Sequence, residues 1–286
     1  MGRRQGRSTG GSGPMTPNPR QWTRSRRDLV IAAVAVLALS RFAEGEVVWL
    51  IGALLMAAVG LGSWQVLGDE ALAAIPRESA INPALAAAVS VWALRLVPVG
   101  LGLAPALLVI GIVIDRCLRI EERIVVGSHA LTPSDRTALL VAAVVIGFIG
   151  FAGVGVVVPG GLADPTAPGA TQLTDQGLLV LAVVDGIIAM LLGYRLSVIR
   201  QANVRAAVWS AATYGGSVAI GAAALRAIGI TRLVGPALLT LVFFLWDAFH
   251  GASPARRRDP RWIWQTALLV VLGAAVVAWN LRIASP

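Results

Sequence analysis

The sequence has no lysine, one cysteine, two histidines and few charged residues, and each shortage excludes a class of protein. Charged residues make up 14% of the 286 residues, against 57% hydrophobic residues and a mean hydropathy of +0.76. A chain of this composition has too little polar surface to cover a soluble globule. The composition therefore indicates a protein that resides in a lipid bilayer.

The scarcity of cysteine and histidine argues against metal and redox chemistry. The single cysteine, Cys117, excludes an intrachain disulfide and a metal site built from cysteines alone. The two histidines, His129 and His250, do not have the spacing of paired metal ligands on a helix. No Ser/His/Asp nucleophile set and no acidic cluster for Mg²⁺ is apparent. We therefore expect no cofactor and no metal, and the sequence leans against an enzyme.

All 24 basic residues are arginine, a bias typical of GC-rich bacterial genomes. The net charge of +9 and the pI near 11.4 are compatible with nucleic-acid binding. However, the arginines lie at the ends of apolar runs, which is where membrane proteins meet phospholipid headgroups. The expected partners are therefore the phospholipid bilayer and anionic lipid headgroups near the cytoplasmic arginine clusters, and not a nucleic acid.

Nine apolar runs follow a polar amino-terminal segment. Residues 1–27 are rich in Gly, Ser, Pro and Arg, which predicts a disordered basic cytoplasmic tail before a transmembrane helical domain at 28–286. We predict an all-α, polytopic transmembrane helix bundle of about nine spans. Because a spanning helix needs about 20 residues, three short runs leave a range of seven to nine. The runs are 29–40, 47–66, 84–97, 101–114, 137–158, 177–194, 206–225, 233–250 and 262–281, of which the first, third and fourth are short.

The distribution of arginine favours nine spans. With the tail inside, nine spans leave nineteen of the 24 arginines on the cytoplasmic side, as the positive-inside rule expects. The loop at 159–176 has no arginine and should lie outside, whereas the segment 195–205 should lie inside. We expect a multi-pass protein of the bacterial cytoplasmic (inner) membrane, with its amino terminus in the cytoplasm and its carboxyl terminus outside.

The segment "RSRRDLVIAAVAVLALSRF" at 24–42 can be interpreted as a secretory signal or as a retained first anchor. It carries a twin-arginine pair, an apolar run and a poor cleavage site. Later spans would keep their directions in both cases, so topology does not decide. Eight further spans follow, which favours a retained anchor.

Two segments share a helical-hairpin pattern. "ALRLVPVGLGLAPALL" and "ALRAIGITRLVGPALL" each place an arginine, Arg95 or Arg226, at the same distance before "PALL". An aspartate, Asp115 or Asp247, closes each descending helix. The pattern indicates either a true internal repeat or the ordinary self-similarity of apolar sequence.

The last third of the chain, with its "LR…GPALL…FF" pattern from Arg226, resembles a family of uncharacterised multi-span bacterial membrane proteins of the Chloroflexi type. The similarity rests on apolar residues and on Arg226. The resemblance implies a polytopic membrane protein and no particular activity, fold or site.

Three charged residues in or near spans are candidate binding residues. Asp185 is the only carboxylate in the middle of a span, where a charge costs several kcal/mol unless it is paired or hydrated. It marks either a functional lumen or a structural pair. Arg95 and Arg226 lie on the outer side, against the charge rule, and either snorkel to headgroups or form an anion site. If their spans are neighbours, Arg95 should pair with Asp185, with Arg226 as the alternative partner.

Other motifs are expected to be structural. The "GFIGFAGVG" segment at 147–155 predicts a helix-packing face, as do Ala207, Ala211 and Gly215 at spacings of four. "TPSD" at 132–135 predicts a helix start with a threonine cap. The charged segment "DRCLRIEER" at 115–123, which contains Glu121, is expected to be a solvated helix end.

Three functional hypotheses follow. The first is a binding, transport or accessory component of the cell envelope, whose lumen Asp185 and the outer arginines would mark. The second is a structural subunit of a membrane assembly, and the third, less favoured, is an enzyme that acts on lipid-linked substrates. Transport predicts a water-accessible Asp185, whereas a structural role predicts that Asp185 is dry and paired.

Overall fold

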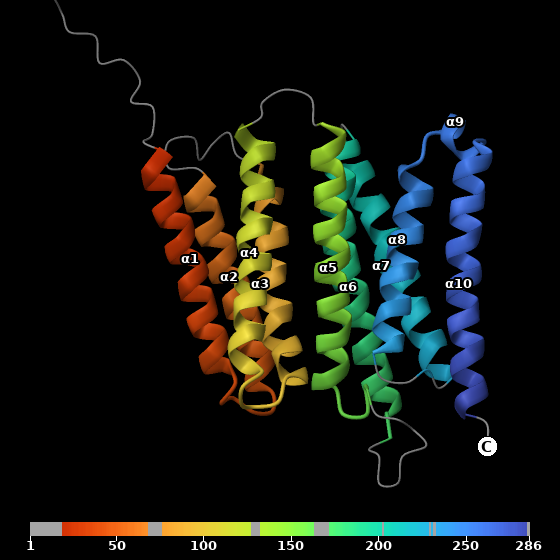
Figure 1. Ribbon diagram of the computed structural model, residues 1–286, viewed down its shortest axis with the longest axis horizontal. Helices are drawn as coiled ribbons and strands as arrows, with labels where there is room; N and C mark the ends of the chain where they lie inside the picture. Colours follow the sequence, from red (N-terminus) through yellow and green to blue (C-terminus); the bar gives the residue numbers. More distant parts are fainter. Residues whose placement is uncertain are drawn as a thin grey trace, which may run out of the picture.

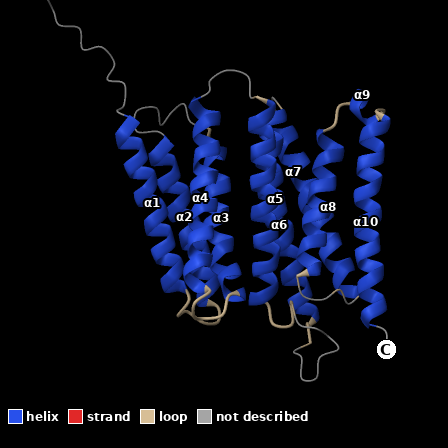
Figure 2. Ribbon diagram, viewed as in Figure 1, coloured by secondary structure: helices blue, strands red, loops and turns tan. Residues whose placement is uncertain are grey.

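The described part of the chain is entirely helical, with ten α-helices, two short 3₁₀ helices and no strand (Figure 2). This computed structural model describes residues 19–67, 76–126, 132–162, 172–201, 203–228, 230 and 233–284. The helices are α1 Pro19–Ser40, α2 Val47–Leu67, η1 Arg77–Ala80, α3 Ile81–Ala93, η2 Leu94–Leu96, α4 Leu103–Val126, α5 Pro133–Val157, α6 Asp175–Arg200, α7 Val204–Ala227, α8 Val234–Gly251, α9 Pro254–Arg257 and α10 Pro260–Ala284.

The long helices stand side by side and alternate in direction from one to the next (Figure 1). The start of α1, the α6–α7 connection and α9 lie at one end of the bundle, together with most of the described arginines. We call this end the Arg-rich end. The turns at 41–46 and 97–102 and the carboxyl terminus lie at the opposite end. The predicted alternation of the nine apolar runs therefore matches the order and direction of the helices.

Seven helical segments in the described residues are long and apolar enough to cross a membrane. They fit a multi-pass membrane protein, but the predicted count of about nine is not confirmed, because α1 and α4 do not belong to the seven. The runs at 29–40 and 101–114 are the apolar parts of these two helices, which continue at the Arg-rich end as charged segments. The short run at 84–97 lies in a helical segment, 77–96, that does qualify.

Two predicted segments fall partly outside the described residues. Helix α1 begins at Pro19, so residues 19–27 of the predicted tail are helical, whereas 1–18 are not described. In the loop predicted to be external, 159–176, residues 163–171 are not described.

Polar caps begin two helices of the second half, α5 and α6, and the cap of α5 is the one that the sequence predicts. The Thr132 hydroxyl accepts a hydrogen bond from the Asp135 backbone amide at 3.2 Å, with Pro133 in the first helical position of α5. Thr174 caps α6 in the same way by accepting from the Gly177 amide at 3.0 Å. Such caps satisfy amides that have no partner inside the helix.

Small residues hold the helices together, as the glycine and alanine patterns predict. Helices α6 and α7 make the most extensive contact of the bundle. There, a Cβ atom added to Gly215 would lie 2.8 Å from the backbone oxygen of Gly186, so neither helix tolerates a larger residue at the crossing. Gly153 of α5 similarly lies against the Ala93 backbone of α3. Ala207, Ala211 and Gly215 are buried, which confirms the predicted packing face.

Large apolar side chains are exposed around the bundle, among them Leu54, Leu108, Ile220 and Trp279. An exposed apolar belt of this kind requires an apolar surrounding. Helix α10 is the extreme case, because only 6% of its apolar window is buried inside the bundle. Its apolar side chains therefore face lipid or another protein.

The two predicted hairpins correspond to α3–α4 and α7–α8, with Arg95 and Arg226 near the end of each first helix. The prediction that an aspartate closes each second helix is correct for one hairpin. Asp247 lies near the end of α8, but α4 continues well beyond Asp115 to Val126. Ion pairs to neighbouring side chains explain this continuation, since Asp115 contacts both Arg26 and Arg119.

Candidate functional site

A polar cavity of about 400 Å³ opens at the Arg-rich end, between the ends of α6 and α8 and the first half of α7. We call it the solute pocket. Serine hydroxyls, a tyrosine and two cationic side chains contribute to its walls, which is unusual in a bundle whose other surfaces are largely apolar. The polar residues of its lining are Arg136, Ser197, Arg200, Gln201, Ser210, Tyr214, His250 and Ser253.

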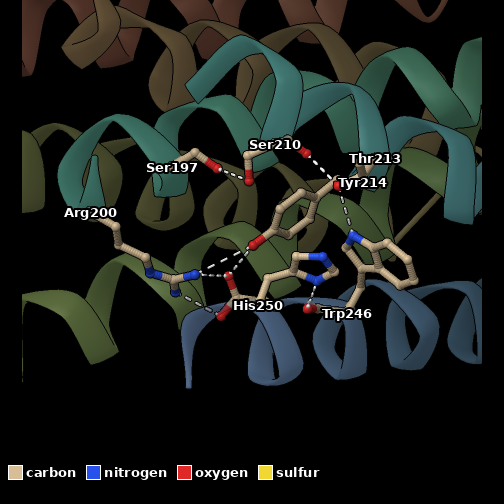
Figure 3. Close-up of polar contacts among 8 residues, drawn as sticks. Ser197, Arg200, Ser210, Thr213, Tyr214, Trp246 and His250 are labelled. Atoms are coloured by element: carbon tan, nitrogen blue, oxygen red, sulfur yellow. Dashed lines mark hydrogen bonds and ion pairs between the residues drawn. The ribbon is translucent and has the colours of Figure 1, made fainter. Parts of the chain in front are cut away.

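Arg200 of α6 and Tyr214 of α7 form the floor of the solute pocket (Figure 3), and both contact Asp247 of α8 behind them. Tyr214 and Asp247 are buried, whereas the Arg200 side chain is partly exposed. The Arg200 guanidinium contacts both carboxylate oxygens of Asp247, at 2.8 and 2.9 Å. The Tyr214 hydroxyl donates to Asp247 Oδ1 at 2.8 Å, and Arg200 Nη1 lies 3.4 Å from the same hydroxyl. Asp247 is only 2% exposed, so this two-point pairing stabilises a carboxylate that would otherwise be costly to bury.

Local sequence brings these three side chains together. Arg200 ends α6, Asp247 precedes the end of α8 by one turn, and Gly251 ends α8. A Cβ atom at Gly251 would lie 2.7 Å from Arg200 Nη1, so glycine leaves the space that the guanidinium occupies. The Tyr214 ring is fully buried and packs on Phe243 with a centroid separation of 5.4 Å. The floor is therefore rigid.

The walls carry further polar groups. Ser197 of α6 and Ser210 of α7 are hydrogen-bonded to each other at 3.0 Å, and Trp246 donates to Thr213 at 3.1 Å (Figure 3). The His250 ring stands 4.5 Å from the Trp246 ring.

Two lining groups are left unsatisfied. The buried Gln201 Oε1 atom accepts no hydrogen bond from the described residues. The Arg136 side chain is exposed and has no ion pair within the part of the chain that the structure describes. Counting only the residues that the structure describes, the pocket thus offers one cation without an ion pair, Arg136, and one free acceptor, Gln201 Oε1.

The arrangement is suited to binding and not to nucleophilic catalysis. Asp247 is occupied by Arg200 and Tyr214, whereas the His250 ring Nδ1 lies 3.1 Å from the Trp246 carbonyl oxygen. A Ser/His/Asp relay requires the carboxylate to orient the histidine, which is not the case here. Among the described residues, no group of three or more His, Cys, Asp or Glu side chains is placed to hold a metal ion.

A second buried ionic cluster lies deeper, between α4 and α6. Arg195 donates through Nε to Glu121 Oε1 at 3.0 Å and through Nη2 to Oε2, and Asn82 donates to Oε1 at 3.2 Å. Glu121 is 0% exposed and Arg195 2%. The prediction of a solvated helix end is therefore wrong for Glu121, because this residue is buried and Arg195 of α6 supplies its countercharge. The neighbouring Glu122 does remain partly exposed and binds Arg26 at 2.7 Å.

Asp185 is buried in the middle of α6, at 2% exposure, and its Oδ1 atom accepts no hydrogen bond from the described residues. Its electrostatic partner is Arg226, near the end of α7. Arg226 Nη2 lies 3.6 Å from where a Gly155 Cβ would be, so glycine on α5 admits the guanidinium. Asp185 does not line the solute pocket.

Arg95 does not meet Asp185. Its guanidinium instead donates to the backbone oxygens of Ser40, at 3.3 Å, and Ala43, which belong to the turn between α1 and α2. The charged groups near it are Arg41 and Glu44. The predicted Arg95–Asp185 pair is therefore wrong. Arg226, the alternative, is the arginine whose charge acts on Asp185, although no ion pair within 4.0 Å joins the two; α6 adjoins α7 far more extensively than α3.

The sequence did not identify the cluster of Arg200, Tyr214 and Asp247. In the sequence, Arg200 is one of several arginines in the segment 195–205 that is predicted to lie inside, and Asp247 is predicted only to close a helical hairpin. One signal was available: Asp247 is a lone carboxylate in the apolar stretch "LVFFLWDAFH" at 241–250. A charge in such a position requires a partner on a neighbouring helix.

No family model matches the chain, and no significant match was found among curated proteins or solved structures. The resemblance to Chloroflexi-type membrane proteins stays an expectation.

Proposed function

We propose that the chain is a multi-pass protein of the bacterial cytoplasmic membrane that binds a small anionic solute, as a binding or accessory component of the cell envelope. The observation that carries the proposal is the solute pocket, with its rigid ionic floor and its unpaired Arg136. With the amino terminus in the cytoplasm, as the arginine distribution favours, this pocket opens to the cytoplasm.

The charges of the pocket favour an anion. Asp247 neutralises Arg200, so Arg136 leaves the lining with a net positive charge when His250 is neutral. The serine hydroxyls can donate hydrogen bonds to carboxylate or phosphate oxygens, and the free Gln201 oxygen can accept from a hydroxyl of the solute. A volume of about 400 Å³ admits a small organic acid or a phosphate ester and excludes a folded partner.

The test is a titration of the purified protein in mild detergent with succinate and, separately, with inorganic phosphate, followed by calorimetry and by thermal shift. We expect at least one of the two anions to bind. Arg136→Gln should weaken binding about tenfold or more, because it removes a charge-assisted hydrogen bond. The matched control is Arg205→Gln, which removes an exposed arginine at the same end but outside the pocket. Equal losses in both variants, or no binding of either anion, would contradict the proposal.

A structural role in a membrane assembly is the second candidate, and α10 favours it. This helix of 25 residues contacts the rest of the bundle only slightly and exposes apolar side chains such as Trp264, Leu268 and Trp279. The burial of Asp185, away from the solute pocket, also agrees with the structural hypothesis. Crosslinking through a cysteine at Leu268, in membranes, would support this role if it yielded a specific adduct with another protein. An absence of adducts would count against it.

A further inference from the structure

The apolar parts of helices α1 and α4 are shorter than the hydrocarbon core of a bilayer, whereas the apolar part of the neighbouring helix α5 matches its thickness. The apolar stretch of α4 runs from Leu103 to Ile114, which is about 18 Å at 1.5 Å per residue. The hydrocarbon core of a bilayer is about 30 Å thick. Helix α5, from Thr137 onward, carries an uncharged stretch of about that length. Charged side chains of α1 and α4 therefore lie at the same depth in the bilayer as apolar side chains of α5.

The depth of Arg116 can be worked out from an ion pair. Arg123 of α4 lies 4.0 Å from Asp135 of α5, which brings these two residues to one level. Arg116 is two helical turns below Arg123, about 10 Å nearer the middle of the bundle. An equal distance along α5 from Asp135 reaches Ala142, an apolar position. Arg116 and Ala142 line the same cavity, which agrees with this estimate.

The Arg116 charge has no partner among the described residues. It is exposed, and the nearby carboxylates on α4 are all occupied: Asp115 by Arg26 and Arg119, Glu122 by Arg26, and Glu121 by Arg195. A free guanidinium next to an apolar wall is strongly disfavoured unless an anion reaches it. That anion has to come from outside the described chain.

The cavity at Arg116 is charged at one end and apolar along its deeper wall, so it matches an amphiphilic molecule. It has a volume of about 880 Å³ and lies between α4 and α5. Four arginines but only one carboxylate, Glu122, line it, and its deeper wall is apolar, with Ile112, Val141 and Val145. We call this cavity the lipid groove. A second cavity of about 480 Å³ lies on the other side of α4, against α1, and shares Arg26, Ile112 and Arg119 with it.

We infer that the lipid groove holds one anionic diacyl phospholipid, with its phosphate on Arg116 and an acyl chain along the apolar wall of α4 and α5. The excess of arginine selects a headgroup without a cationic amine, such as phosphatidylglycerol. The headgroup then lies deeper than in the surrounding leaflet, and the bilayer is locally thinner at α1 and α4, which accommodates their short apolar parts. This lipid site is separate from the solute pocket and does not rest on it.

The test is native mass spectrometry of the full-length protein, which is delipidated in detergent and titrated with phosphatidylglycerol or phosphatidylcholine. We expect one phosphatidylglycerol to be retained with at least tenfold preference over phosphatidylcholine. Arg116→Gln should weaken this binding about tenfold, whereas Arg205→Gln, outside the groove, should leave it unchanged. Val141→Trp, which fills the apolar wall at an exposed position, should also weaken binding, and Val183→Trp on the surface of α6 should not.

Four results would overturn the lipid site. They are equal retention of the two lipids, full affinity in Arg116→Gln, full affinity in Val141→Trp, and complete displacement of phosphatidylglycerol by millimolar inorganic phosphate. The last result would mean that Arg116 binds a free anion and that the apolar wall contributes nothing. Because the readout is the mass of the retained lipid, binding of an anion in the solute pocket does not affect it.

Discussion

Replacing Arg195 by methionine should be among the most destabilising single changes in this bundle. Glu121 is fully buried, and the substitution would leave it with Asn82 as its remaining hydrogen-bond donor among the contacts described above. Removing one partner of a buried ion pair lowers the free energy of unfolding by about 3–5 kcal/mol, because the other charge stays buried without a countercharge. For a chain of this size, such a loss lowers the melting temperature by on the order of 10 °C.

Removing both charges should cost less than removing one. The double variant Glu121→Leu/Arg195→Met leaves no buried charge at this site, and its main penalty is the unsatisfied Asn82 amide, about 1–3 kcal/mol. The matched control is Glu122→Gln. This change breaks the partly exposed pair with Arg26 and should cost about 1 kcal/mol or less.

The native residue Cys117 can report unfolding in this experiment. Cys117 is the only cysteine, it lies one turn before Glu121 on α4, and it is 2% exposed. A fluorogenic maleimide should therefore react with it only when the bundle unfolds, so that heating in detergent gives the melting temperature of each variant. If the double variant melts at a lower temperature than Arg195→Met alone, the buried-pair argument is wrong.

Two further predictions concern topology and the intramembrane carboxylate. In a variant without Cys117, a cysteine at Thr166 should react with an impermeant thiol reagent on intact cells, whereas a cysteine at Asn203 should be protected. The reason is that arginine is absent from the loop 159–176 and abundant in the segment 195–205. The reverse labelling would mean that the topology is inverted. In double-mutant cycles on thermal stability, Asp185→Asn and Arg226→Gln should be coupled by about 1 kcal/mol or more, whereas Asp185→Asn and Arg95→Gln should be additive. Coupling to Arg95 instead would refute the assignment of Arg226 as the electrostatic partner of Asp185.

Local sequence was sufficient for the helices themselves. Apolar runs predict the positions of the helices because a backbone in lipid has to satisfy its hydrogen bonds within each segment. The Thr132 cap and the small-residue faces on α5 and α7 were also predictable, since both depend on residues within a few turns of one helix. Where the helices end was less predictable. The charged halves of α1 and α4 continue as helix because Arg26 pairs with Asp115 and Glu122 across the two.

Only the tertiary structure decided which charges meet. From the sequence, both Arg95 and Arg226 were candidate partners of Asp185, and the extensive contact of α6 with α7 brings Arg226, not Arg95, near enough to act on it. Glu121 and Glu122 are adjacent in the sequence, yet one is buried against Arg195 and the other is partly exposed with Arg26. The physical reason is that the sequence determines how a residue is placed along its own helix, whereas its burial and its countercharge depend on which neighbouring helix faces it.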